Sequence, residues 1–363
     1  MLAQSYTPAA IHSQELDLYL AHGWFRQGQN IFTTNFLKSK GLTYSAIWLR
    51  IDLRAFSPTK THQKLQKLNA KFRVEIRPFI LTETHESLFS QYKSGVSFEA
   101  ALSLQELLLS EANYNVFDTY ELSLYDQDKL IATGIFDVGE SSLMGITCFY
   151  NPHYQKFSLG KYLMFLKMDF AKNRGMDYFY PGYFSPNNPV FDYKLELAKP
   201  FTEYFELKSN SWKSIREYSI SNVPFEVMSL KLRVLQNLLA QKNIETTLFN
   251  YEFFDAELFE RFSGLDTFDF PIFLQCFKDY GNIKQNPIIA YDVRDAKFHL
   301  IICEGIYDIT FLPNNPHHFT AQILRITQHL FSTEPVEIMA NVVATSFALA
   351  EENSVTNPSK IQL

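Results

Sequence analysis

Cysteine is scarce in this sequence. Three occur among 363 residues, Cys148, Cys276 and Cys303, and none lies within metal-ligand spacing of another. A disulfide-stabilised scaffold is therefore excluded, and a zinc or iron–sulfur site built on cysteine is not expected. This low cysteine use predicts a protein of the reduced cytoplasm.

Long hydrophobic runs are also missing. No window approaches the ~18 consecutive apolar residues that a membrane-spanning helix requires. The first twenty residues lack the basic stretch followed by an apolar stretch that marks a secretion signal. We therefore expect neither export nor a membrane partner.

Glycine and proline are few, 13 and 15 residues, while 46% of the chain is hydrophobic. These values exclude collagen-like, low-complexity and disordered classes. The length favours one large or two ordinary domains. Aromatic residues are unusually frequent, with 34 Phe and 20 Tyr, and most of them are expected in the core.

An excess of positive charge is missing as well, because 33 Lys and Arg stand against 39 Asp and Glu. A polyanion would therefore have to bind a local patch. Residues 57–69 offer one, since Pro58 and Thr59 suit a helix start. One face of that helix would carry Lys60, Lys64, Lys67 and Lys71. Such a face is either simply solvated or a binding surface for phosphates.

The middle of the chain predicts an antiparallel meander, then a helix and a further strand. The three β-rich runs are Asp118–Tyr125, Lys129–Val138 and Ser142–Tyr150. Residues Phe157–Arg174 show helical apolar spacing that ends at Gly175, and Met176–Tyr183 is strand-like. This order is typical of a GNAT-like acyltransferase core. We therefore predict an α+β fold with a mixed sheet and flanking helices.

Three regions are expected along the chain: residues 1–116 with the basic helix, a GNAT-like transferase domain at 117–216, and a small additional α+β unit of unread function at 217–363. Further helices in the first region are expected at Glu83–Lys93 and Phe98–Ser110. In the last region helices are expected at Phe225–Lys242, Glu252–Phe262 and Phe319–Phe331, and strands at Pro287–Tyr291, Phe298–Cys303 and Tyr307–Phe311.

Residues Phe149–Pro200 carry a family resemblance. They contain the pattern FxxPxxxxxSLGxY up to Tyr162, the tyrosine-rich YFYPGY at Tyr178–Tyr183, and the pair Tyr193-Lys194. In the first region the segments GWFRQG, LRI and TKTHQKLQKLN occur in matching order. The chain thus resembles the arginyl-tRNA–protein transferases and the bacterial aspartate/glutamate leucyltransferases. It departs from them at Phe36–Trp48, where the family's cysteine motif is absent, so no metal or cluster is expected there.

The resemblance implies transfer of an aminoacyl group, with arginine expected, from charged tRNA to the α-amine of a protein's N-terminal residue, typically an acidic one. This reaction is the aminolysis of an ester. It needs a neutral amine, whose α-amino pKa is near ~7.7–8.0, and donors for the oxyanion that forms. Aminoacyl-tRNA is the co-substrate, and no further cofactor or metal is implied.

The candidate site residues follow from the resemblance together with their positions in the expected elements. As catalytic residues we assign Asp137, Tyr183 and Lys194. The residues assigned to binding the aminoacyl end of the tRNA lie at the helix start, where backbone N–H groups are free. They are Ser158, Leu159, Gly160, Lys161 and Tyr162. The tRNA phosphates are assigned to Lys60, Lys64 and Lys67, and the acidic acceptor to Arg26, Tyr180 and Tyr193.

Each assignment has an ordinary alternative: Ser158 as a helix cap, Asp137 as a turn former, the tyrosines as core and the cations as surface salt bridges. Two other functions also stay open. One is an acyl-CoA-dependent GNAT enzyme, although its pyrophosphate loop should be richer in glycine than FSLGKY. The other is a non-catalytic RNA- or protein-binding relative. The sequence predicts no oligomeric state.

Overall fold

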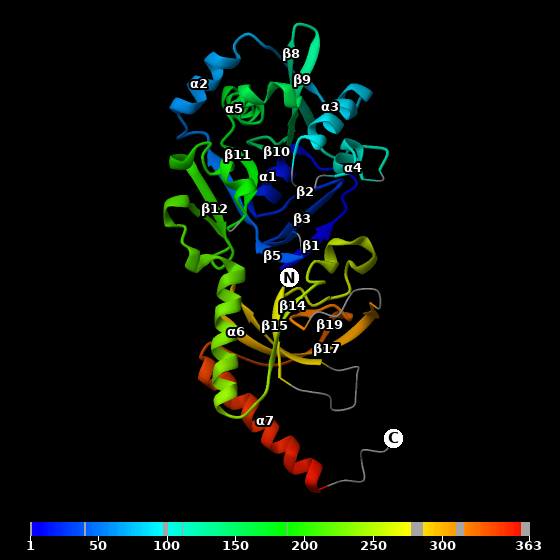
Figure 1. Ribbon diagram of the computed structural model, residues 1–363, viewed down its shortest axis with the longest axis vertical. Helices are drawn as coiled ribbons and strands as arrows, with labels where there is room; N and C mark the ends of the chain where they lie inside the picture. Colours follow the sequence, from blue (N-terminus) through cyan, green and yellow to red (C-terminus); the bar gives the residue numbers. More distant parts are fainter. Residues whose placement is uncertain are drawn as a thin grey trace.

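The computed structural model describes residues 2–39, 41–96, 101–110, 112–186, 188–276, 286–309 and 316–356. Figure 1 shows an elongated molecule in which two parts follow one another along the long axis. The larger part comprises the described residues up to 223, and the C-terminal unit comprises residues 224–356. No helix in the described residues is long and apolar enough to cross a membrane.

An eight-stranded mixed sheet forms the centre of the larger part, in the order β13-β12-β6-β11-β10-β9-β8-β7. Its strands are β6 (Ile47–Asp52), β7 (Arg73–Pro78), β8 (Thr119–Asp126), β9 (Lys129–Val138), β10 (Ser142–Tyr150), β11 (Tyr178–Phe184), β12 (Thr202–Glu206) and β13 (Ser211–Ser214). The antiparallel meander β8–β9–β10 is followed by a helix and by β11, which pairs with β10 in parallel. The predicted order of elements and the α+β fold class are therefore confirmed.

Helices cover both faces of this sheet. They are α1 (Ser13–Ala21), α2 (Lys60–Asn69), α3 (Glu83–Ser94), α4 (Leu104–Leu109) and α5 (Leu159–Asn173). Ile135 and Phe136 of β9 are consecutive and so point to opposite faces. Ile135 packs in a cluster with residues of α3 and α4, and Phe136 packs in a cluster with residues of α5. This double coverage explains why nearly all of β9 is buried.

Two small sheets precede the large one. β1 (Ala3–Tyr6), β2 (Phe25–Gln27) and β3 (Asn30–Thr34) form the first, and β4 (Phe36–Ser39) and β5 (Leu42–Ser45) form a hairpin. The expected boundary at residue 116 falls between strands of one sheet, because β6 and β7 precede it and their partners β11 and β8 follow it.

The C-terminal unit has its own sheet and core. α6 (Pro224–Gln241) and α7 (Val336–Thr356) accompany a sheet in the order β18-β14-β15-β16-β17-β19. Its strands are β14 (Thr247–Tyr251), β15 (Ile272–Gln275), β16 (Asn286–Asp292), β17 (Lys297–Asp308), β18 (His318–Phe319) and β19 (Gln322–Thr333). Leu2 and Phe36 of the larger part also contribute to this core, and the backbone N–H of Leu2 donates to Asp269.

Short 3-10 helices complete the described chain. They are η1 (Pro152–Phe157), η2 (Pro189–Lys194), η3 (Lys199–Phe201), η4 (Ile215–Glu217), η5 (Ile220–Asn222), η6 (Ala256–Leu258) and η7 (Glu260–Phe262). The helix predicted at Glu252–Phe262 is wrong, since η6 and η7 occupy most of that stretch. The reason is local: the Glu257 carboxylate accepts from the N–H groups of Gly264 and Thr267, which favours a compact loop over a continuous helix.

The helix predicted at Phe319–Phe331 is also wrong. Residues Gln322–Thr333 form β19, which pairs with β17 along its whole length. This long-range pairing overrides a local spacing that fits a helix equally well. Pairing also makes β17 one strand where two were predicted, at Phe298–Cys303 and Tyr307–Phe311, the end of the second lying outside the described residues.

The helix predicted at Phe98–Ser110 is shorter in the structure. Its described portion contains α4, Leu104–Leu109, and residues 97–100 lie outside the described residues. The Ser103 hydroxyl accepts from the Glu106 N–H and so starts α4 at Leu104.

Candidate active site

The candidate site lies where β10 and β11 diverge. The two strands pair in parallel over Ser142–Met144 and Tyr178–Tyr180. Beyond that point β10 pairs only with β9, and its register against β9 shifts after Gly145. β11 pairs only with β6, and its register against β6 shifts before Gly182. Because bulges bend and twist a strand, both irregularities help to separate the two strands just before α5 begins.

Lys167 of α5 stabilises the bulge in β10. Its side chain is fully buried, and its ammonium donates to the carbonyls of Ile135, at 2.8 Å, and Thr147, at 3.0 Å. Gly134 makes room for it, since a Cβ there would lie 2.8 Å from the Lys167 Cε. Burial lowers the pKa of Lys167. The sequence analysis did not select Lys167. A lysine on the apolar face of a helix, next to Leu163, Met164 and Met168, does however indicate a buried charge with a specific partner.

The first turn of α5 follows a strained residue. Ser158 has φ of 51° and ψ of 45°, the left-handed region that costs a non-glycine residue energy. Its side chain makes no capping hydrogen bond, so the alternative of an ordinary cap is not realised. Leu159, Gly160 and Lys161 begin the helix, and their N–H groups have no acceptor within it. The positive end of α5 thus presents backbone donors, with Gly160 placed against the Tyr150 ring.

Lys194 ends η2 beside the second strand of the divergence. Its ammonium donates to the Tyr183 carbonyl at 2.9 Å and lies 5.0 Å from the centre of the Tyr183 ring and 5.3 Å from that of Phe191. Gly182, at φ of 92°, permits this approach, since a Cβ there would lie 3.0 Å from the ammonium. Burial lowers the pKa of Lys194 to about 8. Lys194 is therefore expected to lose its proton at a lower pH than an ordinary lysine, although the charged form still dominates at pH 7.

Further contacts join η2 to α5. Lys161 in the first turn of α5 forms an ion pair with Glu196, two residues beyond Lys194, at 2.9 Å. Cys148 of β10 lies against α5, with its Sγ 3.7 Å from the Met164 Sδ, and is close enough to Lys194 to influence its pKa. Sequence reasoning did not select Cys148. The structure thus brings Lys194, Tyr183 and the start of α5 to one place.

Tyr193 lies beside Lys194 on η2. Its side chain is 38% exposed as a whole, yet desolvation of its hydroxyl raises the pKa. Leu159 and Tyr162 of the donor loop are buried in the core under α5, so that these two side chains are not presented to a ligand.

Arg26 and Asp137 form a buried pair. The Arg26 Nη1 donates to Asp137 at 2.8 Å and to Thr119 at 2.9 Å, and Nη2 donates to the Leu108 carbonyl at 2.6 Å. Burial raises the pKa of Asp137, while Arg26 and Thr119 oppose that rise. The sequence assigned these residues to the acceptor and to catalysis. In the structure they contact each other, and both are shielded from solvent.

Tyr180 lies in the core on the same side of the sheet as α1. It is 1% exposed and packs against Phe25 and Trp212 at centroid distances of 6.4 and 5.5 Å. Burial raises its pKa to about 12. Tyr180 is therefore a core tyrosine, as the alternative interpretation of the sequence predicted.

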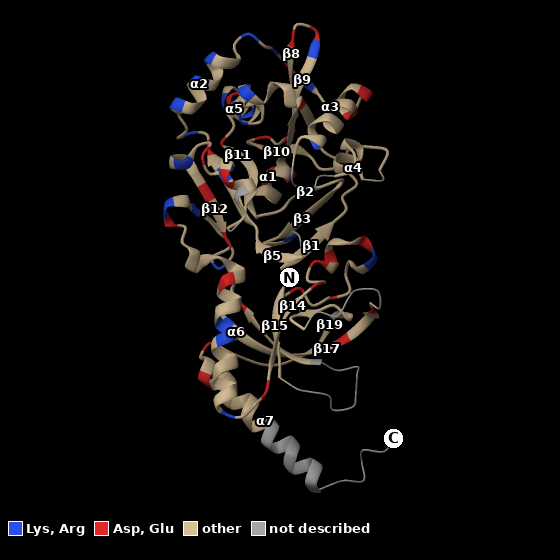
Figure 2. Ribbon diagram, in the orientation of Figure 1, with Lys and Arg blue, Asp and Glu red and all other residues tan. Residues whose placement is uncertain are grey.

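The basic helix predicted near residue 60 is confirmed as α2. The Thr59 hydroxyl accepts from the His62 N–H at 3.2 Å and caps it. Lys60, Lys64 and Lys67 are exposed, and none forms an ion pair with another described residue. Figure 2 shows basic residues in blue along α2.

The opposite face of α2 is fixed to α5. His62 Nε2 lies 3.0 Å from Asp169 Oδ2, and the His62 ring stacks on Phe165 at 4.5 Å. At the other end of α2, the Asn69 amide donates to the Phe157 carbonyl at 3.2 Å, one residue before Ser158. The lysine face and the start of α5 therefore belong to one rigid arrangement.

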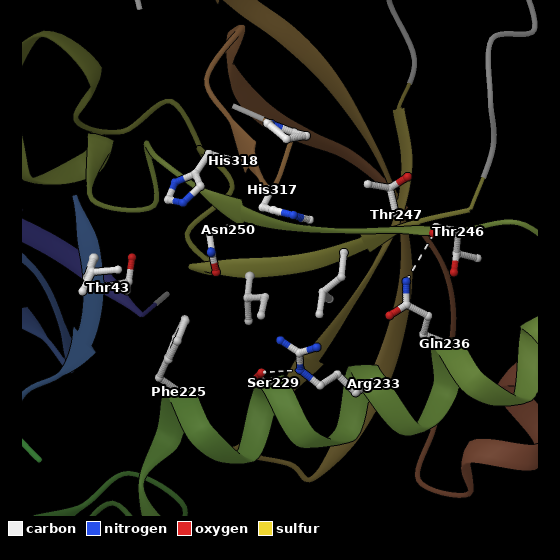
Figure 3. Close-up of a pocket in the computed structure, with 14 residues that line it drawn as sticks. Thr43, Phe225, Ser229, Arg233, Gln236, Thr246, Thr247, Asn250, His317 and His318 are labelled. Carbon is white, nitrogen blue, oxygen red and sulfur yellow. Dashed lines mark hydrogen bonds between the residues drawn. The ribbon is translucent and has the colours of Figure 1, made fainter. Parts of the chain in front are cut away.

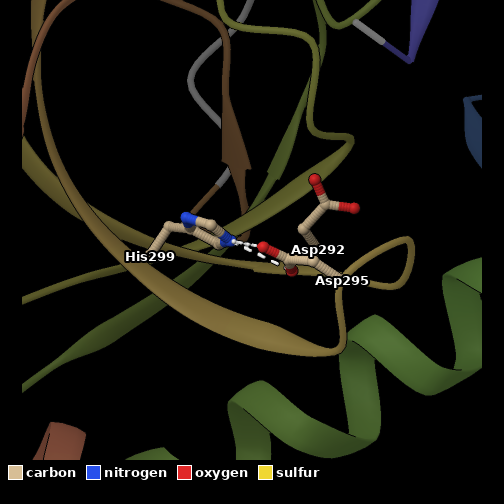
Figure 4. A group of neighbouring side chains, drawn as sticks. All are labelled: Asp292, Asp295 and His299. Atoms are coloured by element: carbon tan, nitrogen blue, oxygen red, sulfur yellow. Dashed lines mark hydrogen bonds and ion pairs between the residues drawn. The ribbon is translucent and has the colours of Figure 1, made fainter. Parts of the chain in front are cut away.

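One cluster of possible metal ligands lies in the C-terminal unit, at Asp292, Asp295 and His299 (Figure 4). Arg294 binds both oxygens of Asp292 at 2.6–3.0 Å, and His299 Nε2 lies 3.1 Å from Asp295. These contacts already compensate the carboxylates, so the cluster is explained without an ion.

Comparisons with known proteins identify the family of this chain. Residues 80–202 match the family model described as arginine-tRNA-protein transferase, C terminus. The aspartate/glutamate leucyltransferase of Leptospira interrogans is 30% identical over 194 residues, covering 52% of this chain and 73% of that protein. That of Campylobacter jejuni is 28% identical over 169 residues, covering 44% of this chain and 70% of that protein.

Among solved structures, L-PGS from Bacillus licheniformis matches with a TM-score of 0.30 and 14% identity, covering 47% of this chain and 49% of that one. A tandem GNAT protein from the clavulanic acid biosynthesis pathway matches with a TM-score of 0.30 and 13% identity, covering 54% and 57%. The sequence matches carry the assignment: this chain belongs to the arginine-tRNA-protein transferase family, which includes the aspartate/glutamate leucyltransferases.

Proposed function

We propose that the chain is an aminoacyl-tRNA–protein transferase, which moves an aminoacyl group from charged tRNA to the α-amine of an acceptor protein that begins with Asp or Glu. The observation that supports this most is that α5 contacts two other features: α2, which carries the lysine face, through Asp169 and His62, and the segment after Lys194 through Lys161 and Glu196. Aminoacyl-tRNA is the co-substrate, and the cytoplasm, where charged tRNA is used, is the proposed location.

In the proposed reaction, the acceptor nitrogen attacks the carbonyl carbon of the aminoacyl ester. A C–N bond forms, and the bond from that carbon to the ribose oxygen of the terminal adenosine breaks. The N–H groups of Leu159, Gly160 and Lys161, at the start of α5, are the proposed donors to the oxyanion between these steps. Lys60, Lys64 and Lys67 would hold tRNA phosphates, and correct positioning supplies much of the rate for an activated ester.

Lys194 is the proposed base. Its pKa of about 8 is close to the ~7.7–8.0 of an α-amine, which suits proton exchange between the two near neutral pH. The nitrogen loses a proton to Lys194, and the departing ribose oxygen gains one. Tyr183 fixes the ammonium through its carbonyl and ring, and Tyr193 is proposed to border the acceptor.

Arg26, Asp137 and Tyr180 enter the proposal as positioning residues. The ion pair ties β2 to β9, and β9 is the strand against which the bulged β10 runs. Tyr180 belongs to the paired portion of β11 just before the divergence.

The transferred amino acid is best decided by experiment. Arginine is the expectation from the sequence, whereas the relatives named above carry leucyl in their names. The groups described around Lys194 are aromatic, and Glu196 nearby is already paired with Lys161. An arginyl side chain would need a carboxylate partner, and Asp192 of η2 is exposed and forms no ion pair with another described residue, so both donors are tested.

The test is transfer of radiolabelled amino acid from a mixed pool of charged tRNAs to peptides that begin with Asp, Glu, Lys or Arg. We expect label on the acidic peptides, and separate leucyl- and arginyl-tRNA reactions then identify the donor. A parallel reaction with labelled acetyl-CoA tests the acyl-CoA alternative. Binding of tRNA without any transfer would contradict the proposal and support the non-catalytic relative.

A further inference from the structure

A cavity of about 610 Å³ lies where the larger part meets the C-terminal unit (Figure 3). α6 forms one side of it, with Phe225, Ser229, Arg233 and Gln236 on one helix face. The other sides come from β5, β14 and the residues around the start of β18. This volume falls within the ~300–1,000 Å³ of small-molecule sites.

After Phe225, the stripe of α6 that borders the cavity is polar: Arg233 is exposed, and Ser229 and Gln236 are half-buried. The neighbouring stripe of the same helix is apolar and fully buried, at Met228, Leu232, Leu235 and Leu239. Ser229, Arg233 and Gln236 instead point toward β14 across the cavity (Figure 3). Polar side chains directed into a concave space between two parts of a protein are typical of a binding site.

The cavity is also one-sided in charge. None of its 14 lining residues is Asp or Glu, whereas Arg233, His317 and His318 line it. His318 is held by Glu252. Arg233 has no carboxylate partner among the described residues, and its Nε donates to the Ser229 hydroxyl at 3.4 Å. Its remaining N–H donors are therefore available, in the fork geometry that suits a carboxylate or a phosphate.

Half of the remaining lining is apolar. It includes Leu42, Phe225, Leu248, Ile272 and Pro316. We propose that the cavity binds a small organic anion, whose phosphate or carboxylate is held by Arg233 and Ser229 and whose aromatic body lies against Phe225. The site shares no lining residue with the divergence of β10 and β11, and the proposal does not depend on the transfer reaction.

Calorimetric titration of the full chain tests this proposal with two pairs of probes. Adenosine 5′-monophosphate is compared with adenosine, and N-acetyl-phenylalanine with its neutral amide. We expect one anion to bind at least about tenfold more tightly than its neutral partner, as charge-assisted hydrogen bonds predict. The nucleotide as the tighter anion would identify a phosphate ligand, and the amino-acid derivative would identify a carboxylate ligand.

Two variants make the test specific. Arg233→Gln should weaken binding of the preferred anion by about tenfold or more, because it removes the charged donor. Lys231→Gln removes the same charge from an exposed position of the same helix outside the cavity, and should change the affinity by less than about twofold. Equal affinities for anions and neutral probes, no binding of either anion at millimolar concentration, or equal effects of the two variants would overturn the proposal.

Discussion

The two parts of the molecule place their buried charges differently. In the larger part, buried charged side chains connect separate elements: Arg26 of β2 pairs with Asp137 of β9, and Lys167 of α5 donates to the carbonyls of Ile135 and Thr147 in the sheet. These groups lie inside a core where apolar side chains would be the ordinary choice.

In the C-terminal unit, the buried carboxylate of Glu257 instead serves a nearby loop, whereas Asp269 reaches Leu2 of the larger part. Glu257 accepts from the backbone N–H groups of Gly264 and Thr267, and the core around it is aromatic and aliphatic. Glu257 is therefore satisfied within ten residues of its own position and does not connect distant elements.

This difference in buried charges indicates which part of the larger region has a geometry that packing alone does not provide. Burying a charge costs free energy unless partners compensate it, and an apolar core of similar volume is often at least as stable. Apolar side chains, however, cannot satisfy the carbonyls at a bulge. Lys167 therefore maintains the strand geometry at the bulge of β10, where β10 and β11 diverge.

The largest effect is expected when the buried ion pair is broken. Arg26→Met leaves the Asp137 carboxylate without its cation, which should destabilise the protein by about 3–5 kcal/mol in urea unfolding. Glu257→Gln, the matched change in the C-terminal unit, keeps one accepting oxygen and should cost about 1–2 kcal/mol. Similar costs for the two variants would break the comparison. Asp137→Asn, which keeps an acceptor for Arg26, serves if Arg26→Met fails to fold.

Removal of the proposed base should affect transfer more than folding. Lys194→Met is expected to lower the rate of aminoacyl transfer by about 100-fold, because general-base catalysis contributes at least that much. Lys231→Met, an exposed lysine of the C-terminal unit, should leave the rate unchanged. Equal rates for Lys194→Met and the unmodified chain would exclude Lys194 as the base.

The same variant tests the pKa of Lys194. Its pKa of about 8 in the folded chain lies below the ~10.4 of an unfolded lysine. Between these values the unfolded chain binds more protons, so this lysine makes stability rise with pH over that window. Unfolding free energies at pH 8 and 10 should therefore rise more for the unmodified chain than for Lys194→Met. Parallel pH dependences would show that Lys194 titrates normally.

Lys167→Met should destabilise the protein by about 1–3 kcal/mol, since it leaves the buried Ile135 carbonyl and the half-buried Thr147 carbonyl without their donor. It should also slow transfer, because β10 loses the support of its bulge. Tyr251→Phe in the C-terminal unit removes a buried acceptor of the Leu324 N–H and is the matched control. It should destabilise similarly without an effect on transfer by the folded protein. A transfer rate unaffected by Lys167→Met would show that the bulge in β10 does not contribute to the candidate site.

The smallest effect is expected on tRNA affinity. Replacing Lys60, Lys64 and Lys67 together by Glu should weaken binding and reduce the slope of log affinity against log salt by about 2–3. The control replaces three exposed lysines of the C-terminal unit, Lys231, Lys242 and Lys297, in the same way. Equal losses in both triple variants would indicate a general charge effect and not a specific role for α2.

Local sequence patterns predicted much of the fold, because many helices and turns are determined by residues that lie close together in the sequence. The cap at Thr59, the meander and α5 are all encoded by residues near one another in sequence. β19 was mistaken for a helix because its strand character depends on β17, with which it forms a long ladder. The sequence contains no local signal for that pairing.

The candidate site was predictable only in part for the same reason. The family motifs identify Lys194 and the start of α5, which the structure brings together. The mutual burial of Arg26 and Asp137 could not be predicted, since 111 residues separate them along the chain. Nor do the motifs reveal the support that Lys167 gives to the bulge, because the bulge itself arises from pairing between strands.

The most direct test of the central claim compares the unmodified chain with Lys194→Met in one transfer assay. Labelled leucyl-tRNA and arginyl-tRNA are supplied separately, with peptides that begin with Asp or Lys as acceptors. The account predicts label on the Asp peptide from one of the two tRNAs, and about 100-fold slower labelling by the variant. Absence of label from both tRNAs, or equal labelling by the two proteins, would contradict transfer at the divergence of β10 and β11.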